Sequence, residues 1–486
     1  MTGFSLPLKF QHPLAMVLLF IGLLVFYRGV IFEDQSFLPP DTIASLSFQT
    51  LVKDADEAGI FPLWNPYIFC GMPGYASGTV HGERAFDLSA FLMGKLSIFF
   101  ALLLLNSDIG WVLFYYFLFG VGVYFLVWQL AESKIAAFVA ALGALFSPHL
   151  ITWVSIGHMT KMPVLAFLPY VLLLLERLRL NFHWALAVIL VFVLHFLFLP
   201  AHFQMIFYVY LAVGVYFLFN ILRVLVRKQE WKGYVRAGTI FAVATGLAFL
   251  LTADGYLSTL EYVDYSIRGS GPLVETAAPG GERAGSGGGL DYDYATNWSF
   301  SPGEMMTFLV PSWYGFGWHT YEGPISQNQP IRLNTYFGPQ PFTDLPPYMG
   351  VTVLFLAGLG LVRYRKDPFV QFLAVTIVLS LLISFGKEFS LVYDLFFYQV
   401  PFFNKFRVPS MILALVQIAV PILAGYGVRW IIDNRGVHMA PLSERRWKYA
   451  IGGMGIFFTL ALIGRSLLRG VYEVFASPTE VGQRLA

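Results

Sequence analysis

The chain has 486 residues, of which 57% are hydrophobic and only 12% are charged, and its mean hydropathy is +0.65. Soluble domains carry about 25% charged residues, so the composition excludes a soluble globular protein and predicts a multi-pass membrane protein. The net charge of +2 is small, and we expect no nucleic-acid partner. The single cysteine, Cys70, excludes an internal disulfide and a cysteine-rich metal site.

Apolar runs of the length that crosses a bilayer, about 17 to 25 residues, recur along the chain. The first follows Lys9 and has no small-residue cleavage site, so we expect it to be an uncleaved signal anchor. The run 86–105 contains Lys95, and we expect it to be a re-entrant or surface-lying helix. The predicted spans are eleven, near 13–32, 110–130, 135–151, 163–178, 184–200, 203–223, 237–257, 349–363, 368–385, 410–431 and 448–465.

The positive-inside rule gives these spans a direction. If 86–105 does not cross, nearly every short basic cluster lies on the cytoplasmic side, and if it crosses, they face outward. We therefore predict an all-α polytopic membrane protein with the N-terminus inside and the C-terminus outside. It forms one transmembrane domain, 1–486, with long structured outer loops, the first at 33–109 and the largest at 258–348. All but six of the 29 acidic residues then face outward, which places the function on the extracytoplasmic side.

The first outer loop contains the segment PLWNPYIFCGMP, residues 62–73. Three prolines and a glycine disfavour a long helix or a central strand there. The aromatic side chains of Trp64, Tyr67 and Phe69 still offer large apolar surfaces for packing. We expect a structured loop that forms one wall of an extracytoplasmic site.

Polar residues recur at the predicted outer ends of the spans. Carboxylate, imidazole and several cations at one depth suit a substrate that carries a phosphate at the level of the lipid headgroups. The residues are Asp34 and Asp41 after the first span, His158 and Lys161 in GHMTK, His202 and Gln204 in AHFQM, Arg268 after the seventh span, and Lys405 and Arg407 in FNKFRVPSM.

Each of these residues also has a structural explanation. His202 can cap a helix, Asp34 can be a solvated residue at the end of the first span, and Asp41 can cap a helix that starts at Thr42. Lys405 and Arg407 can extend to the outer headgroups. No phosphate-binding loop, dinucleotide fingerprint, zincin helix or nucleophile elbow is present. The residues leave a divalent cation open as a cofactor, although no tight ligand spacing predicts one.

The chain resembles the YfhO-like bacterial membrane proteins of the GT-C glycosyltransferase superfamily. The resemblance rests on six segments in the family's order, PPDTIAS, PLWNPYIFCGMP, GHMTKMPVLAFLP, AHFQMIFY, GLDYDYATNWSF and FNKFRVPSM. It implies a helical bundle in which the first outer loop carries a catalytic acid and sugar comes from a polyprenyl-phosphate or polyprenyl-diphosphate donor. Asp41 matches that acidic position, with Asp34 as the second candidate. Many relatives continue into a further outer region beyond the point where this sequence stops.

Three functions follow as hypotheses. The first is a sugar transferase of the bacterial inner membrane that uses a polyprenyl-phosphate donor, with an envelope glycan, lipid or protein as acceptor. Asp41 acts there as a general base, so the anomeric centre is inverted. The second is a transporter or flippase for a lipid-linked glycan, for which His195 is the clearest ionisable residue inside a span. The third is a non-catalytic subunit of a larger membrane complex.

Overall fold

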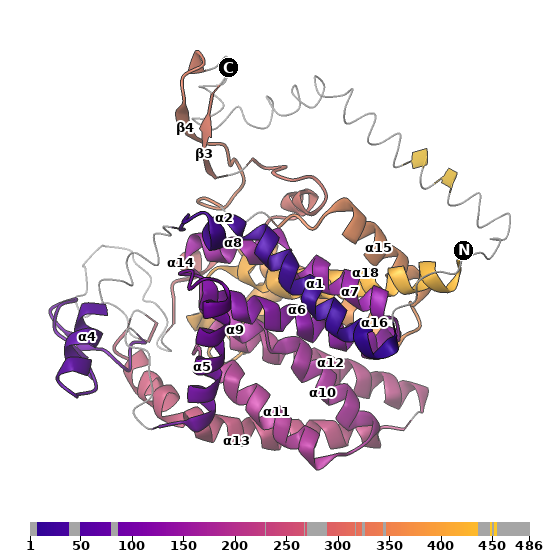
Figure 1. Cartoon of the computed structure of the whole chain (residues 1–486), viewed down its shortest axis with the longest axis horizontal. Coiled ribbons are helices and arrows are strands. Elements are labelled where there is room, and N and C mark those ends of the chain that lie inside the picture. Colours follow the sequence, from indigo (N-terminus) through magenta and orange to yellow (C-terminus); the bar gives the residue numbers. More distant parts are fainter. Residues whose placement is uncertain are drawn as a thin grey trace.

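The computed structural model describes residues 7–37, 49–78, 86–228, 230–266, 268–269, 289–315, 317–322, 326–343, 347–435, 448–449 and 452–453. These residues are mostly helical, and Figure 1 shows the long helices gathered in one bundle, with α4 and the β3–β4 hairpin projecting from it. Five helices in this part of the chain are long and apolar enough to cross a membrane. They are Gly110–Ala131, Lys134–Ile156, Phe203–Arg227, Lys232–Val263 and Pro409–Asp433.

The elements follow the predicted spans closely. The α-helices are α1 (Leu8–Phe26), α2 (Arg28–Phe32), α4 (Gln49–Glu57), α5 (Leu88–Leu103), α6 (Gly110–Ala131), α7 (Lys134–Leu145), α8 (Pro148–Ile156), α9 (Lys161–Leu165), α10 (Leu168–Leu180), α11 (Trp184–Phe198), α12 (Phe203–Arg227), α13 (Lys232–Val263), α14 (Tyr292–Thr296), α15 (Val351–Arg363), α16 (Pro368–Ser384), α17 (Leu391–Gln399) and α18 (Leu413–Asp433). Short 3-10 helices lie at Gly303–Phe308, Gly386–Phe389, Phe403–Lys405 and Pro409–Ile412.

Helix α18 lies at the centre of the bundle. Every residue from Leu413 to Gly427 is buried, and the helix packs against α7, α15 and α16. Gly360 and Gly427 allow α15 and α18 to approach until their backbones touch, because a Cβ at Gly427 would lie 2.0 Å from the carbonyl oxygen of Leu356. Inside a bilayer, helices have no hydrophobic driving force for association. Small residues at such contacts allow close packing of the backbones, which stabilises the helix pair instead.

Some predicted spans are built differently from expectation. The first is interrupted at Tyr27, between α1 and α2, and the span predicted at 163–178 consists of α9 followed by α10. The last, 448–465, lies almost wholly outside the described residues. The number of spans and the direction of the chain across the membrane therefore stay predictions.

Helix α5 has both of its ends at the same end of the bundle. Its first residue follows Asp87, whose carboxylate Oδ2 lies 2.6 Å from Nε2 of His195, in the last turn of α11. At its other end a short turn leads into α6, where the hydroxyl of Tyr116 donates to the carbonyl of Leu150 in α8. Sixteen residues of helix cover about 24 Å. Figure 1 shows α5 running across the direction of the long helices at one end of the bundle, and its position relative to the membrane stays a prediction.

The expected all-α architecture also contains two short antiparallel hairpins. In the first loop, β1 (Trp64–Asn65) pairs with β2 (Met72–Pro73), so the proline-rich segment forms a tight two-residue ladder. In the largest predicted loop, 258–348, β3 (Trp318–Tyr321) pairs with β4 (Ile331–Asn334). That loop is also shorter than predicted, because α13 continues as far as Val263.

Candidate functional site

The GHMTK turn is formed where α8 stops and the chain reverses into α9. Gly157 ends α8 with a φ of +92°, a conformation that glycine adopts without a Cβ penalty. Its N–H donates to the carbonyls of Trp153 and Val154. The reversal leaves His158 in the turn and Lys161 as the first residue of α9.

The side chain of Lys161 is buried and contacts the rings of His158 and Trp153. Its side chain belongs to a residue only 5% exposed, and its Nζ lies 2.8 Å from Nδ1 of His158. The same ammonium lies 5.7 Å from the centre of the Trp153 ring. A hydrogen bond and a cation–π contact together offset part of the cost of burying the charge.

The residues at the start of α12 connect this turn to the segment that precedes α18. Nδ1 of His202 accepts from the backbone N–H of Met205 at 3.4 Å, so His202 caps α12 and its structural explanation is confirmed. Gln204 is buried and its amide nitrogen donates both to the hydroxyl of Tyr208 and to the carbonyl of Arg407, each at 2.7 Å. The bond to the Arg407 carbonyl holds the backbone at that residue in place.

Three further predicted cations meet at the same place. Arg268 and Lys405 are bonded reciprocally: the guanidinium of Arg268 donates to the carbonyl of Lys405, and Nζ of Lys405 donates to the carbonyl of Arg268 at 3.0 Å. Arg407 donates through Nη1 to the hydroxyl of Tyr294 at 2.6 Å. All three bonds go to neutral oxygens, so they orient the cations without neutralising them.

The backbone next to Arg407 is strained. Val408 has a φ of +62°, which is an outlier for a β-branched residue. Its N–H donates to the carbonyl of Ala295 at 3.1 Å, and this bond to the α14 segment holds the conformation. Strain of this kind costs about 1–3 kcal/mol and persists where the surroundings over-determine the backbone.

The charges of these side chains act on one another. Burial and the charges of Lys161 and Arg407 lower the pKa of His158 to about 3. Burial and the charge of Lys161 lower the pKa of His202 to about 3, with a smaller effect from Arg268. Burial and the charge of Arg407 lower the pKa of Arg268. We call these five residues the cation cluster.

One member of this neighbourhood was missed in the sequence. His149, in α8, is 4% exposed, and neither ring nitrogen has a hydrogen-bond partner among the described residues. Its ring contacts Trp153 at a centroid distance of 6.0 Å, and it lies close enough to Lys161 and His158 to be influenced by their charges. The available signal was a histidine four residues before Trp153, on the same helix face.

Of the two predicted acids, only Asp34 lies among the described residues. Asp34 is exposed, with a φ of +50°, just after α2. Asp41 lies within 38–48, outside the described residues. Within the described ranges no three His, Cys, Asp or Glu side chains form a set that could hold a metal ion. His195, the candidate for a transport pathway, instead contacts Asp87 at the start of α5.

The cation cluster is suited to binding an anion. Lys161, Arg268 and Arg407 supply fixed positive charge, and neutral imidazoles at pH 7 supply N–H donors. In the tautomer in which Nδ1 of His158 accepts the hydrogen bond from Nζ of Lys161, the ring carries its own proton at Nε2. Comparison with known proteins finds no match to this chain, whether by family model, by sequence among curated proteins or by fold among solved structures.

Proposed function

We propose that this protein is a membrane glycosyltransferase that moves a sugar from a polyprenyl-phosphate donor to an acceptor hydroxyl. The observation that carries the proposal is the cation cluster: Lys161 acts on both imidazoles, Arg407 acts on His158, and Arg268 acts on His202. Guanidinium groups bind phosphate oxygens in a bidentate manner, and the low dielectric around a buried ammonium strengthens its attraction for an anion. The resemblance to the YfhO-like proteins supports the same substrate class.

The proposed reaction is a direct displacement. Asp41 removes the proton of the acceptor hydroxyl while its oxygen forms a bond to the anomeric carbon of the donor sugar. The bond from that carbon to the phosphate oxygen breaks with its electron pair, and the configuration inverts. The phosphate gains negative charge as it departs, which Lys161 and Arg407 stabilise. Preorganised charge of this kind needs no rearrangement during the reaction.

The proposed location is the bacterial inner membrane, with the cation cluster on the extracytoplasmic side. Cations on that side run against the positive-inside rule, which favours a functional reason for them. The sidedness has a direct test, because Asn106 is exposed in the turn that follows α5. In a variant without Cys70, a cysteine at position 106 should react with an impermeant reagent from outside. Reaction only from the cytoplasmic side would reverse the proposed orientation.

The transfer itself is tested with a radiolabelled polyprenyl-phosphate sugar. We expect the purified protein to bind the donor and to pass the label to an acceptor from the same envelope. Asp41→Asn keeps the size of the side chain and removes its charge, so transfer should fall by about 100-fold to 10,000-fold while donor binding is retained. Movement of intact labelled donor across vesicles, without transfer, would instead identify a flippase. Absence of both donor binding and transfer would favour the non-catalytic subunit.

A further inference from the structure

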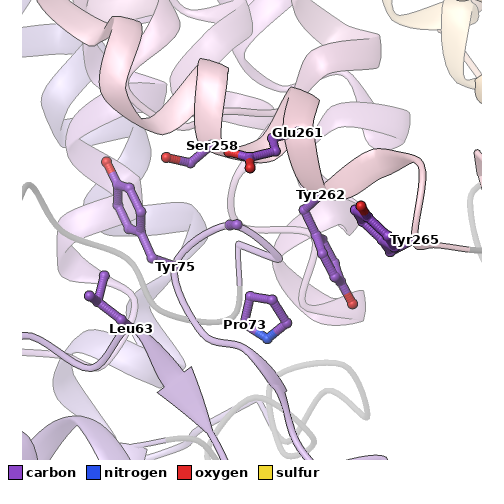
Figure 2. A pocket seen from close by; sticks show the side chains of 8 residues that line it. Leu63, Pro73, Tyr75, Ser258, Glu261, Tyr262 and Tyr265 are labelled. Atoms are coloured by element: carbon purple, nitrogen blue, oxygen red, sulfur yellow. The ribbon is translucent and has the colours of Figure 1, made fainter.

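A cavity lies between the first loop and the end of α13, near Arg268 of the cation cluster. Its volume is about 300 Å³, and Figure 2 shows Leu63, Pro73 and Tyr75 on the loop side facing Ser258, Glu261 and Tyr262 on the helix side. Tyr265 extends the same wall. The volume is at the small end of the range for ligand sites in proteins.

The helix wall follows from spacing along α13. Positions 258, 261, 262 and 265 are separated by three and four residues, so a continued helical turn brings them to one face. This face presents a hydroxyl, a carboxylate and two phenol rings. Tyr265 lies just beyond the end of α13 at Val263 and is 80% exposed.

The loop wall is fixed to α13 by a polar contact. The hydroxyl of Tyr75 donates to Oδ2 of Asp254 at 3.1 Å, and its ring packs edge-on against Phe61 at a centroid distance of 5.2 Å. The β1–β2 pair holds Pro73 in the ladder two residues before this tyrosine. The cavity is therefore formed between two anchored walls and does not depend on an isolated loop.

The cavity and the cation cluster are neighbours. Tyr265 and Arg268 are three positions apart in the sequence, so their Cα atoms lie at most about 11 Å apart. Arg268 is in turn bonded to Lys405, in the segment that carries Arg407. A ligand in the cavity would thus lie within a few sugar-ring widths of a phosphate in the cation cluster.

We propose that this cavity binds a neutral sugar ring of the acceptor. Tyr262 and Tyr265 offer flat apolar faces with polar tips, which match the apolar face and hydroxyl rim of a pyranose. Ionised Glu261 only accepts hydrogen bonds, so it suits sugar hydroxyls and repels the donor phosphate. The cavity therefore separates acceptor from donor by charge. This inference rests on the proposed function, because a transferase needs an acceptor subsite beside the phosphate site.

The test measures sugar binding directly, without requiring transfer. The protein is placed in phosphatidylglycerol nanodiscs, which contain no sugar detergent, and is mixed with cellotetraose, chitotetraose or maltotetraose. Saturation-transfer NMR should show signals from the ring protons of at least one of them. The double variant Tyr262→Ala/Tyr265→Ala should reduce those signals at least fivefold, and Glu261→Gln should reduce them less. Tyr67→Ala is the matched control, because Tyr67 is an exposed tyrosine of the same loop that does not line the cavity.

Four results bear on the proposal. Ring-proton signals that depend on Tyr262 and Tyr265, with donor affinity unchanged in the double variant, support it. No signal from any oligosaccharide, or equal signals in the double variant, overturns it. Loss of donor affinity with intact oligosaccharide binding also overturns it, because the cavity then holds the donor. The lipid-headgroup analogue glycerophosphoethanolamine is tested in the same way. If it alone gives signals that depend on Tyr262 and Tyr265, the cavity binds a lipid headgroup and the proposal is overturned.

The proposed function can fail independently. If the double variant loses oligosaccharide binding but the parent protein never glycosylates the bound oligosaccharide or an envelope acceptor, the sugar subsite stands and the transferase assignment falls.

Discussion

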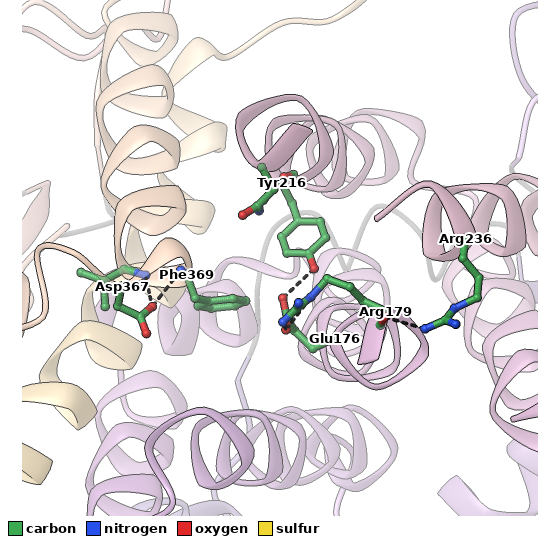
Figure 3. A network of polar contacts seen from close by, with 8 residues as sticks. Glu176, Arg179, Tyr216, Arg236, Asp367 and Phe369 are labelled. Carbon is green, nitrogen blue, oxygen red and sulfur yellow. Dashed lines mark hydrogen bonds and ion pairs between the residues drawn. The ribbon is translucent and has the colours of Figure 1, made fainter. Parts of the chain in front are cut away.

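The arginines near the two ends of the α9–α10 stretch have different hydrogen-bond partners: a carboxylate at one end and neutral oxygens at the other. Near the end of α10, Arg179 donates to Glu176 at 2.6 Å and 3.2 Å, and the other carboxylate oxygen of Glu176 accepts from Tyr216 at 2.6 Å (Figure 3). Arg236 joins this network through the carbonyls of Leu178 and Arg179, at 3.0 Å and 2.7 Å. Here a buried carboxylate neutralises a half-buried guanidinium.

At the other end, Arg268 and Arg407 donate to a carbonyl and a phenol oxygen, which leave their charge in place. The difference separates two uses of a cation in a membrane protein. A cation paired with a buried carboxylate joins helices, whereas a cation oriented by neutral oxygens keeps its attraction for an anion. The comparison therefore favours a structural role for the Glu176 network and agrees with the binding role that we propose for the cation cluster.

The largest expected effect is on stability and follows from breaking the Glu176 network. Glu176→Ala leaves the half-buried guanidinium of Arg179 without its carboxylate and the buried hydroxyl of Tyr216 without its acceptor. We expect the free energy of unfolding to fall by about 1–3 kcal/mol. Thermal unfolding in nanodiscs measures the change. Glu176→Met combined with Arg179→Leu should lose less than the sum of the single variants, and strict additivity would contradict the coupling.

The next effect is on the pH dependence of stability. The pKa of about 3 for His158 and for His202 lies below the ordinary imidazole value. As pH falls, the two imidazoles therefore bind protons in the unfolded state before they do so in the folded state. Stability is fully present above about pH 6.5 and is lost as pH falls toward 3, by at most about 1.4 kcal/mol per pH unit for each ring. Lys161→Met removes a charge that lowers both pKa values, so its loss of stability between pH 7 and pH 5 should be smaller.

The control for that experiment is Lys366→Met, which replaces an exposed lysine far along the sequence, in the turn between α15 and α16. It should show the parental pH dependence in thermal unfolding. A parental pH dependence in Lys161→Met would show that Lys161 does not act on the two imidazoles.

The smallest effect concerns the orientation of Arg407. Tyr294→Phe keeps the ring below the guanidinium and removes the hydroxyl that accepts its hydrogen bond. A bond of this kind contributes about 0.5–1.5 kcal/mol, so donor affinity should fall about twofold to tenfold. Titration with a polyprenyl monophosphate measures the change. An unchanged affinity would mean that Tyr294 does not position Arg407 for the ligand.

Much of the helical architecture could be predicted, because a bilayer imposes length and composition on each span. The expectation for 86–105 rested on Lys95 and charge sorting; a helix, α5, is present there, and whether it crosses the membrane stays a prediction. The interruption at Tyr27 could not be predicted, since the apolar run continues through it. Nor could the β1–β2 ladder, whose two-residue strands leave no alternation to detect.

The sequence predicted which residues form the candidate site, but it did not predict the contacts that they make. Cations at the outer ends of spans indicated Lys161, Arg268 and Arg407, and the structure brings them together. The sequence alone does not show that the amide of Gln204 donates a hydrogen bond to the carbonyl of Arg407, because that bond joins residues 203 positions apart. His149 was overlooked because a lone histidine within an apolar run usually has a structural partner, and here both ring nitrogens lack one among the described residues.

The most direct test of the account is the affinity of the cation cluster for a lipid phosphate. Titration of a polyprenyl monophosphate into nanodiscs compares the parent with Arg407→Ala and with Arg365→Ala, an exposed arginine between α15 and α16. Charge-assisted contacts contribute about 1.5–3 kcal/mol, so Arg407→Ala should weaken binding about tenfold to 100-fold. Arg365→Ala should bind as the parent does, and the neutral polyprenol should not distinguish the three proteins. Parental affinity in a folded Arg407→Ala variant would contradict the assignment of the cation cluster to phosphate.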